Sequence, residues 1–264
     1  MPSSATYGVD DEGFIKTEVM ASKIQVPYFK LVEDVKNRLG HVTGNQLHGL
    51  HLYGSVVTGK AQVPTSDLDV LVVLRQQPTE TLTSQIKTAE AALSQKYSHI
   101  ARDVAVGITF PKEIDADLYG IGCFIKHLCV CVLGEEMQAS LPRFKPTQQV
   151  AKAFNGDFEK VREKYLSQLE TTPPEGISRL SEQISRKFIR TGFSLVTARE
   201  QSWTTDPQMA CDAFAKYYPD KAADMQRTLQ ISKQPGVSKR DLLELLVGFG
   251  GWLAHEVERE LSRI

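Results

Sequence analysis

Apolar residues change their spacing along this chain, and the change divides it into two parts. In the first part, short apolar and β-branched runs alternate with amphipathic stretches, which is typical of an α/β fold. Gly40 is placed to end one helix, and Thr79 lies near the start of another. We predict helices at 26–39 and 79–96, and strands at 47–52, 68–74, 102–110 and 121–133, the last after a short helix.

From Pro146 onward, aliphatic residues recur at helical spacing and the strand-like alternation disappears. Ser238 is suited to cap the last helix, with Asp241 in the third position of a capping box. The pattern predicts an α/β (α+β) fold class: a small mixed sheet with flanking helices in residues 1–145, then an all-helical bundle domain in residues 146–264. The predicted helices of the second part are 148–169 (interrupted at Gly156), 177–199, 207–217, 222–229 and 238–261.

Two aspartates open the most apolar predicted strand. Asp67 and Asp69 flank Leu68, and side chains two residues apart on a strand point to the same side. The two carboxylates therefore share a face, where they repel each other unless a cation lies between them. Hard oxygen ligands of this kind suit Mg²⁺, which proteins hold with one or two carboxylates plus substrate phosphates.

A glycine and a serine precede this pair by eleven residues. Gly54 lets the backbone approach a phosphate closely, and Ser55 offers a hydroxyl and an N–H group to it. Gly59 and Pro64 turn the chain so that the two motifs converge. A Gly-Ser turn or a D-x-D strand start alone is commonly structural, but their joint occurrence between apolar strands favours a phosphate and metal site.

These residues resemble the signature of the DNA polymerase β-like nucleotidyltransferase superfamily: glycine-serine, a spacer, then D-x-D. Within it, the segment 52–74 (LYGS…GK…SDLDVLV) is most similar to the aminoglycoside adenylyltransferases of the spectinomycin/streptomycin type. The resemblance implies that residues 1–145 form the catalytic domain and that ATP is the co-substrate. It also implies that Asp67 and Asp69 hold magnesium, two ions in all, and that Gly54, Ser55 and Ser66 bind the nucleotide.

The superfamily commonly adds a third carboxylate on a later strand, and Asp103 is the best candidate for it. Asp103 would complete the metal site or act as general base on the acceptor hydroxyl. The alternative is an exposed aspartate at a strand start. Asp115 and Asp117 form a second D-x-D, but they lie in a polar turn and are weaker candidates.

In the helical part, Arg190 matches the arginine that adenylyltransferases place over the nucleotide phosphates; a solvated helix face is the alternative. The family's following lysine is absent here, where residues 203–206 read Trp-Thr-Thr-Asp, although Arg199 could substitute. An aminoglycoside is polycationic, so its pocket needs several carboxylates. The matching helix does not show this balance: it carries Arg179, Arg186, Lys187 and Arg190, with Glu175 and Glu182 as the nearest acids.

The composition of the chain argues against several other classes of protein. A formal net charge of -1 over 264 residues argues against a dedicated DNA-coating protein, and no apolar run approaches the length of a membrane span. The four cysteines form no zinc-type pairs and no dense disulfide pattern, which favours reduced thiols in the cytoplasm. His127, Cys129 and Cys131 alternate on a predicted strand; a buried strand with small thiols is favoured there over a soft-metal site.

The sequence therefore predicts a magnesium-dependent nucleotidyltransferase that moves a nucleoside monophosphate, AMP from ATP, onto a hydroxyl of a small-molecule acceptor such as an aminoglycoside. Two alternatives stay open: a tRNA, other RNA or protein acceptor, and a non-catalytic nucleotide-binding module. Intact Asp67, Asp69 and Ser55 argue against the last of these.

Overall fold

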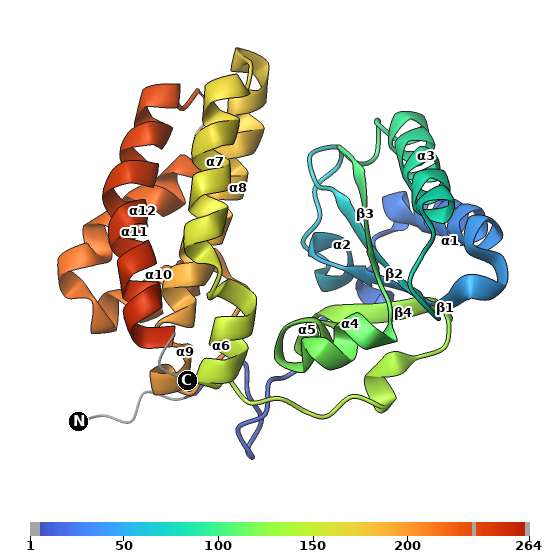
Figure 1. Cartoon of the computed structure of the whole chain (residues 1–264), viewed down its shortest axis with the longest axis horizontal. Helices are drawn as coiled ribbons and strands as arrows, with labels where there is room; N and C mark the ends of the chain where they lie inside the picture. Colours follow the sequence, from blue (N-terminus) through green and yellow to red (C-terminus); the bar gives the residue numbers. More distant parts are fainter. Residues whose placement is uncertain (1–5, 234–235, 262–264) are drawn as a thin grey trace. The chain divides into compact units, whose positions relative to one another are not determined.

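The computed structural model describes residues 6–233 and 236–261, which form two compact units (Figure 1). One unit is Lys16–Arg143 and holds the sheet. The other joins Phe144–Ile264 to the first fifteen residues of the chain and is helical. Within the described residues, no helix is both long enough and apolar enough to cross a membrane.

A four-stranded mixed sheet forms the centre of the first unit, as the sequence predicted. Its strands are β1 (Leu47–Tyr53), β2 (Leu68–Leu74), β3 (Val104–Thr109) and β4 (Cys129–Gly134), in the spatial order β3-β2-β1-β4. The β2–β3 pair is parallel, whereas β1 is antiparallel to both β2 and β4. The parallel pair matters for the site because it brings the starts of two strands together.

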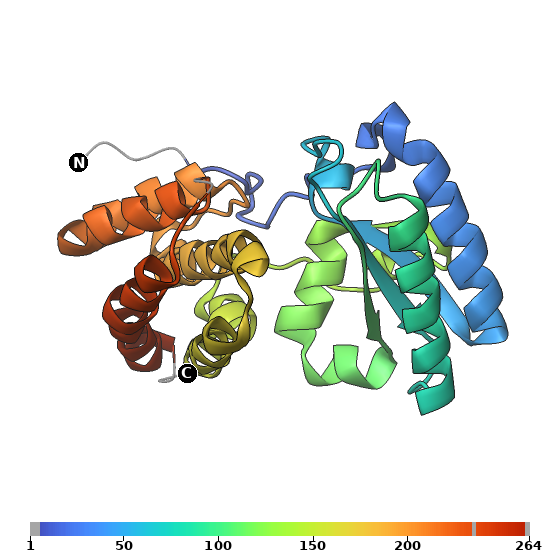
Figure 2. The same cartoon turned by 90° about the horizontal axis from the view of Figure 1, so that it is seen from above.

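Helices cover both faces of this sheet. On one face, α1 (Phe29–Thr43) and α3 (Glu80–Lys96) lie side by side over the larger apolar core (Figure 2). On the other face, α4 (Pro111–Ala116) and α5 (Cys123–Leu128) lie over a smaller cluster around Leu71, Val73 and Ile125. The N-cap of α3 is Thr79, whose Oγ1 accepts a hydrogen bond from the N–H of Leu82.

Three details differ from the sequence-based expectation. Helix α1 passes through Gly40 and ends at Thr43, because Gly40 lies against the Leu133 side chain and allows the helix to approach β4 closely. The turn after β1 contains a short helix, α2 (Ser55–Thr58). His127 lies on α5 and not on a strand, since β4 begins only at Cys129, so His127 does not alternate with the two cysteines.

The second unit is a bundle whose helices pack around α8. Its core is rich in aromatic residues, among them Phe158, Phe188 and Phe214. The predicted helix over 148–169 breaks at Gly156, as expected, whereas the predicted helix over 177–199 is two helices. The seven helices that the described residues contain here are α6 (Gln148–Asn155), α7 (Phe158–Thr171), α8 (Ile177–Ser194), α9 (Thr197–Glu200), α10 (Pro207–Tyr217), α11 (Ala222–Ile231) and α12 (Lys239–Leu261).

The predicted capping box at the start of α12 is confirmed. The N–H of Asp241 donates to Oγ of Ser238, and the N–H of Ser238 donates back to Oδ2 of Asp241, each at 3.1 Å. Short turns complete the fold. They are the 3₁₀ turns Ala21–Lys23, Val26–Tyr28, Gly44–Gln46, Met137–Ala139, Pro174–Gly176 and Pro219–Lys221, and the π turn Leu118–Gly122.

The segment 6–15 packs on the residues of the helical unit. The N–H of Trp203 donates to the carbonyl of Tyr7 at 3.0 Å, and the N–H of Ile15 donates to the carbonyl of Phe144 at 2.8 Å. Gly8, with φ +65°, permits the close approach: a Cβ there would lie 1.9 Å from the Trp203 carbonyl oxygen. These contacts explain why the first fifteen residues group with Phe144–Ile264.

Candidate active site

The three candidate carboxylates lie at the starts of the two parallel strands. Asp67 directly precedes β2, Asp69 is its second residue, and Asp103 directly precedes β3. Leu68 is in register with Val104, and the N–H of Leu68 donates to the carbonyl of Asp103 at 2.9 Å. The ladder thus extends to the aspartates, which places Asp67 beside Asp103.

Strand alternation then gives the three side chains a common face. Leu68 and Val104 are buried in the larger core under α1 and α3. Residues one position away point to the opposite face, so Asp67, Asp69 and Asp103 all lie on the face that carries α4 and α5. Each is partly exposed, and one oxygen of Asp103, Oδ2, is shielded from solvent.

Gly54 brings the backbone of the preceding turn against Asp69. Its φ is +75° and its ψ is -152°, a conformation that L-residues avoid. A Cβ on Gly54 would lie 2.3 Å from Oδ2 of Asp69. The glycine is therefore required twice over, by its backbone angles and by the carboxylate that occupies the place of a side chain.

The two candidate serines lie on either side of this turn. Ser55 begins α2, and within the described part of the chain its hydroxyl makes no hydrogen bond. The hydroxyl can therefore form a hydrogen bond with a ligand. Ser66 has a structural role, because its Oγ accepts from the N–H of Gln62 at 2.9 Å and closes the loop before β2. The Ser66 carbonyl also accepts from the N–H of Arg102 at 3.1 Å, which ties the loop to the start of β3.

Arg102 is the site residue that the sequence analysis missed. Its Nε–H donates to Oδ1 of Asp67 at 3.0 Å, and its Nη2–H donates to Oδ2 of the same carboxylate at 2.8 Å. This is a bidentate pair, the strongest geometry between a guanidinium and a carboxylate. No local sequence pattern identifies this pair, because the partner of Arg102 depends on how β2 and β3 pair.

The donor set fits magnesium. Asp67 and Asp69 supply hard carboxylate oxygens on one face, and Gly54 leaves no side chain beside Asp69, which allows a phosphate to approach. Among the residues that the structure describes, no three acidic, histidine or cysteine side chains converge as a metal cluster. Asp67 is turned to Arg102 instead, so metal ligation by Asp67, Asp69 and Asp103 stays a prediction.

The weaker aspartate candidates lie elsewhere. Asp115 is exposed on α4, and Asp117 caps the following turn by accepting from the N–H groups of Gly120 and Ile121. Both follow β3, whereas Asp103 precedes it. The six-residue strand that lies between them along the chain is roughly 20 Å long.

Arg190 belongs to the helical unit and is exposed on α8, where its Nε–H donates to the carbonyl of Arg186 at 3.1 Å. One turn earlier, Lys187 is half-buried against α6 and bonds to Asp157 at 3.3 Å. Burial lowers the pKa of Lys187, and the nearby Arg190 charge acts in the same direction. Arg199 packs over the rings of Tyr217 and Tyr218, so it has a structural partner already.

The sheet unit also buries two histidines, one on β1 and one on α5. His51 on β1 is fully buried, and desolvation together with the nearby His48 lowers its pKa to about 4. Desolvation, with the Lys126 charge, also lowers the pKa of His127 to about 4. All four cysteines are free thiols, and burial raises the pKa of Cys123 to about 12, so this thiol is unreactive at neutral pH.

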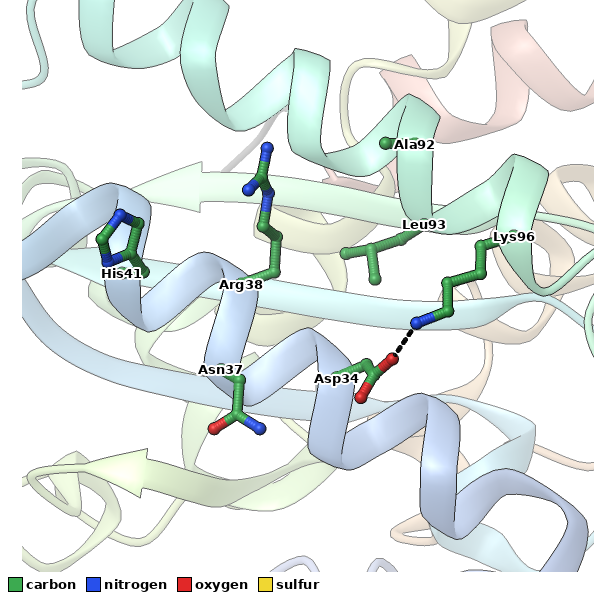
Figure 3. Close-up of a pocket in the computed structure, with 7 residues that line it drawn as sticks. All are labelled: Asp34, Asn37, Arg38, His41, Ala92, Leu93 and Lys96. Carbon is green, nitrogen blue, oxygen red and sulfur yellow. Dashed lines mark hydrogen bonds and ion pairs between the residues drawn. The ribbon is translucent and has the colours of Figure 1, made fainter.

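A surface hollow of about 400 Å³ lies between α1 and α3, away from these residues (Figure 3). Asp34, an acidic residue that lines the hollow, accepts hydrogen bonds from Lys96 and from the Tyr97 hydroxyl. These bonds hold the pKa of Asp34 below its ordinary value. Figure 3 shows Lys96 reaching from α3 to Asp34 on α1. The pair links two helices, and none of the predicted site residues lines the hollow.

A small mixed sheet with helices on both faces, followed by a helical bundle, is the fold of nucleotidyltransferases with a helical domain. A search of solved structures matches the chain to the crystal structure of a spectinomycin adenyltransferase from Enterococcus faecialis, with ATP and spectinomycin. The TM-score is 0.60 at 14% sequence identity, over 87% of this chain and 99% of that chain. No protein-family model and no curated protein matches the sequence. The structural match shows that the predicted resemblance holds at the level of the fold.

Proposed function

We propose that this protein is a magnesium-dependent nucleotidyltransferase that moves AMP from ATP onto a hydroxyl group of an acceptor. The observation that carries the proposal is the common face of Asp67, Asp69 and Asp103, with Gly54 pressed against Asp69. The fold supports it, because the matched spectinomycin adenyltransferase was solved with ATP. A non-catalytic nucleotide-binding module would not need three carboxylates on one face.

In this proposal each residue has a separate role. Asp67 and Asp69 would hold magnesium, and the turn formed by Gly54 and Ser55 would bind triphosphate oxygens through the Ser55 hydroxyl and backbone N–H. Asp103 would accept the proton of the acceptor hydroxyl as that oxygen attacks the α-phosphorus and pyrophosphate leaves. Magnesium, when bound, would neutralise charge on the attacking and leaving oxygens.

The acceptor has two candidates. The matched protein was solved with spectinomycin, which favours a small molecule bearing hydroxyl groups. Helix α8 favours an anionic acceptor, such as RNA or an acidic protein surface, because Arg179, Arg186 and Arg190 are all exposed on it. Of its nearest acids, Glu182 is paired with Arg186 at 3.7 Å and so offsets one of these three positive charges. Of these two candidates we expect the small-molecule acceptor, and we expect the reaction to take place in the cytoplasm.

The experiment is an acceptor panel. The full chain is incubated with Mg²⁺ and each of four NTPs carrying an α-phosphorus label, against aminoglycosides including spectinomycin, bulk tRNA and a protein mixture. We expect label from ATP on a small molecule, and none in the Asp69→Asn variant. Label on tRNA or protein alone would support the second candidate. If the folded protein binds ATP but labels no member of the panel, that result would contradict the proposal that it transfers AMP to an acceptor of these classes.

A further inference from the structure

The carboxylate of Asp67 is already occupied by a cation, the Arg102 guanidinium. Each of its oxygens accepts one N–H group, at 3.0 and 2.8 Å, and the Arg102 and Asp67 side chains keep 30% and 20% of their surface exposed. A guanidinium stays protonated at any ordinary pH. The guanidinium is therefore permanently charged, but the pair is open enough to solvent to be broken.

The same oxygens would be needed by a divalent cation. A fork of two N–H groups lies in the plane of the carboxylate and uses the lone pairs that a metal would use. Asp69 is less free to change, since Gly54 lies against its Oδ2. Between the two aspartates, Asp67 is the one that must exchange its partner when a metal binds.

We propose that Arg102 is the built-in counter-ion of the metal site: it neutralises Asp67 in the metal-free protein and competes with the divalent cation for that carboxylate. The inference rests on the proposed function for the identity of the cation, but it concerns only binding. It makes Arg102 a positioning residue that raises the Mg²⁺ concentration needed to fill the site. It also reduces the repulsion that Asp67 would otherwise exert on Asp69 and Asp103.

The test measures Mn²⁺ binding to the full chain by electron paramagnetic resonance, without nucleotide or acceptor. Mn²⁺ is chosen because it takes the same oxygen ligands and gives a direct signal. In Arg102→Gln we expect the apparent Kd for Mn²⁺ to fall roughly five-fold, the size of a partly exposed ion pair. Arg102→Lys keeps the charge but loses the fork, so we expect an intermediate value.

Two controls assign the effect to Asp67. Arg75 also pairs with an acid in the same unit, Glu135 at 2.6 Å, at a place remote from the start of β2. Arg75→Gln should leave Mn²⁺ binding unchanged. In the double variant Arg102→Gln with Asp67→Asn, the gain in affinity should disappear. Without metal, Arg102→Gln should also melt at a lower temperature than the wild type, and Mn²⁺ should raise its melting temperature by more.

Mn²⁺ affinity equal to or weaker than wild type in both Arg102 variants would overturn the inference. So would a lower transfer rate at unchanged Mn²⁺ affinity, because Arg102 would then act on substrate. If Arg102→Gln does not fold, as judged by circular dichroism, Arg102→Lys decides alone. A gain in Mn²⁺ affinity in a protein that transfers nucleotide to no acceptor would support the counter-ion and contradict the proposed function, so the two can fail separately.

Discussion

Gly54 is the residue at which the candidate site tolerates the least change. Its backbone angles exclude an ordinary side chain, and the Asp69 carboxylate fills the space where a Cβ would be. Gly44, at the end of α1, has similar angles, φ +48° and ψ -131°, with nothing within 4 Å of an added Cβ. The two glycines therefore separate the cost of backbone strain from the cost of displacing a site residue.

We predict that Gly44→Ala loses about 1–2 kcal/mol of unfolding free energy through strain alone and keeps its transfer rate. Gly54→Ala should lose at least as much stability, and its transfer rate should fall by roughly 100-fold because Asp69 must move. Urea unfolding and initial rates check both variants. Equal rates in the two variants would mean that Asp69 does not need its present position.

Asp103 lies on the same face of the sheet as Asp67 and Asp69, directly before β3. If it accepts the proton of the acceptor, Asp103→Asn should lower the catalytic rate by roughly 10²–10⁴-fold. ATP binding should change much less, because the contacts of Asp67, Asp69 and Ser55 remain. A magnesium titration of the rate distinguishes the roles: a metal ligand would shift the magnesium dependence together with the rate, and a surface aspartate would shift neither.

At the scale of elements, the sheet unit buries two histidines, His51 on β1 and His127 on α5. His51 and His127 both have a pKa of about 4 in the folded chain, compared with an ordinary value of 6.5. In the described structure, neither ring nitrogen of His51 has a hydrogen-bond partner of normal geometry. The Gly49 backbone opposes the effect of burial on the His51 pKa only in part. Both rings are therefore neutral in the fold at neutral pH.

This lowered pKa fixes the direction of the pH dependence. Between pH 6.5 and 4 the unfolded chain takes up protons that the folded chain does not, so stability is full above pH 6.5 and falls toward pH 4. The loss should reach at most about 3 kcal/mol for each histidine. His51→Leu should flatten this slope, whereas His41→Gln, at an exposed position on α1, should not. Urea unfolding between pH 7 and 4 measures it, and an unchanged slope in His51→Leu would contradict the assignment.

The elements themselves were largely predictable, for physical reasons that particular residues show. β2 and α10 have the predicted bounds because β-branched runs and an Asp-Pro helix start are local signals. Gly40 misled the prediction because its role is contact with Leu133, which is distant in sequence. Arg102 was missed for the same reason: its partner is defined by the β2–β3 pairing, which no local pattern contains.

At the scale of the whole molecule, two separate cores account for two compact units. The sheet unit holds Asp67, Asp69, Asp103, Gly54 and Ser55, and the helical unit holds Arg190 and the residues of α8. The short segment 6–15 joins the helical unit through Tyr7, Gly8 and Ile15, so the chain crosses from one unit to the other twice, near residues 15 and 143. The match to the spectinomycin adenyltransferase structure covers 87% of this chain, so it includes residues of both units.

The central claim is that the three carboxylates serve transfer at the α-phosphorus of a nucleotide. The most direct measurement follows ATP labelled at either the α- or the γ-phosphorus, with Mg²⁺ and the acceptor found in the panel, in the wild type and in Asp67→Asn and Asp69→Asn. We predict that the α-label moves to the acceptor while the γ-label leaves in pyrophosphate, and that both variants lose transfer yet remain folded. Transfer of the γ-label, or near-normal turnover in either variant, would contradict the account.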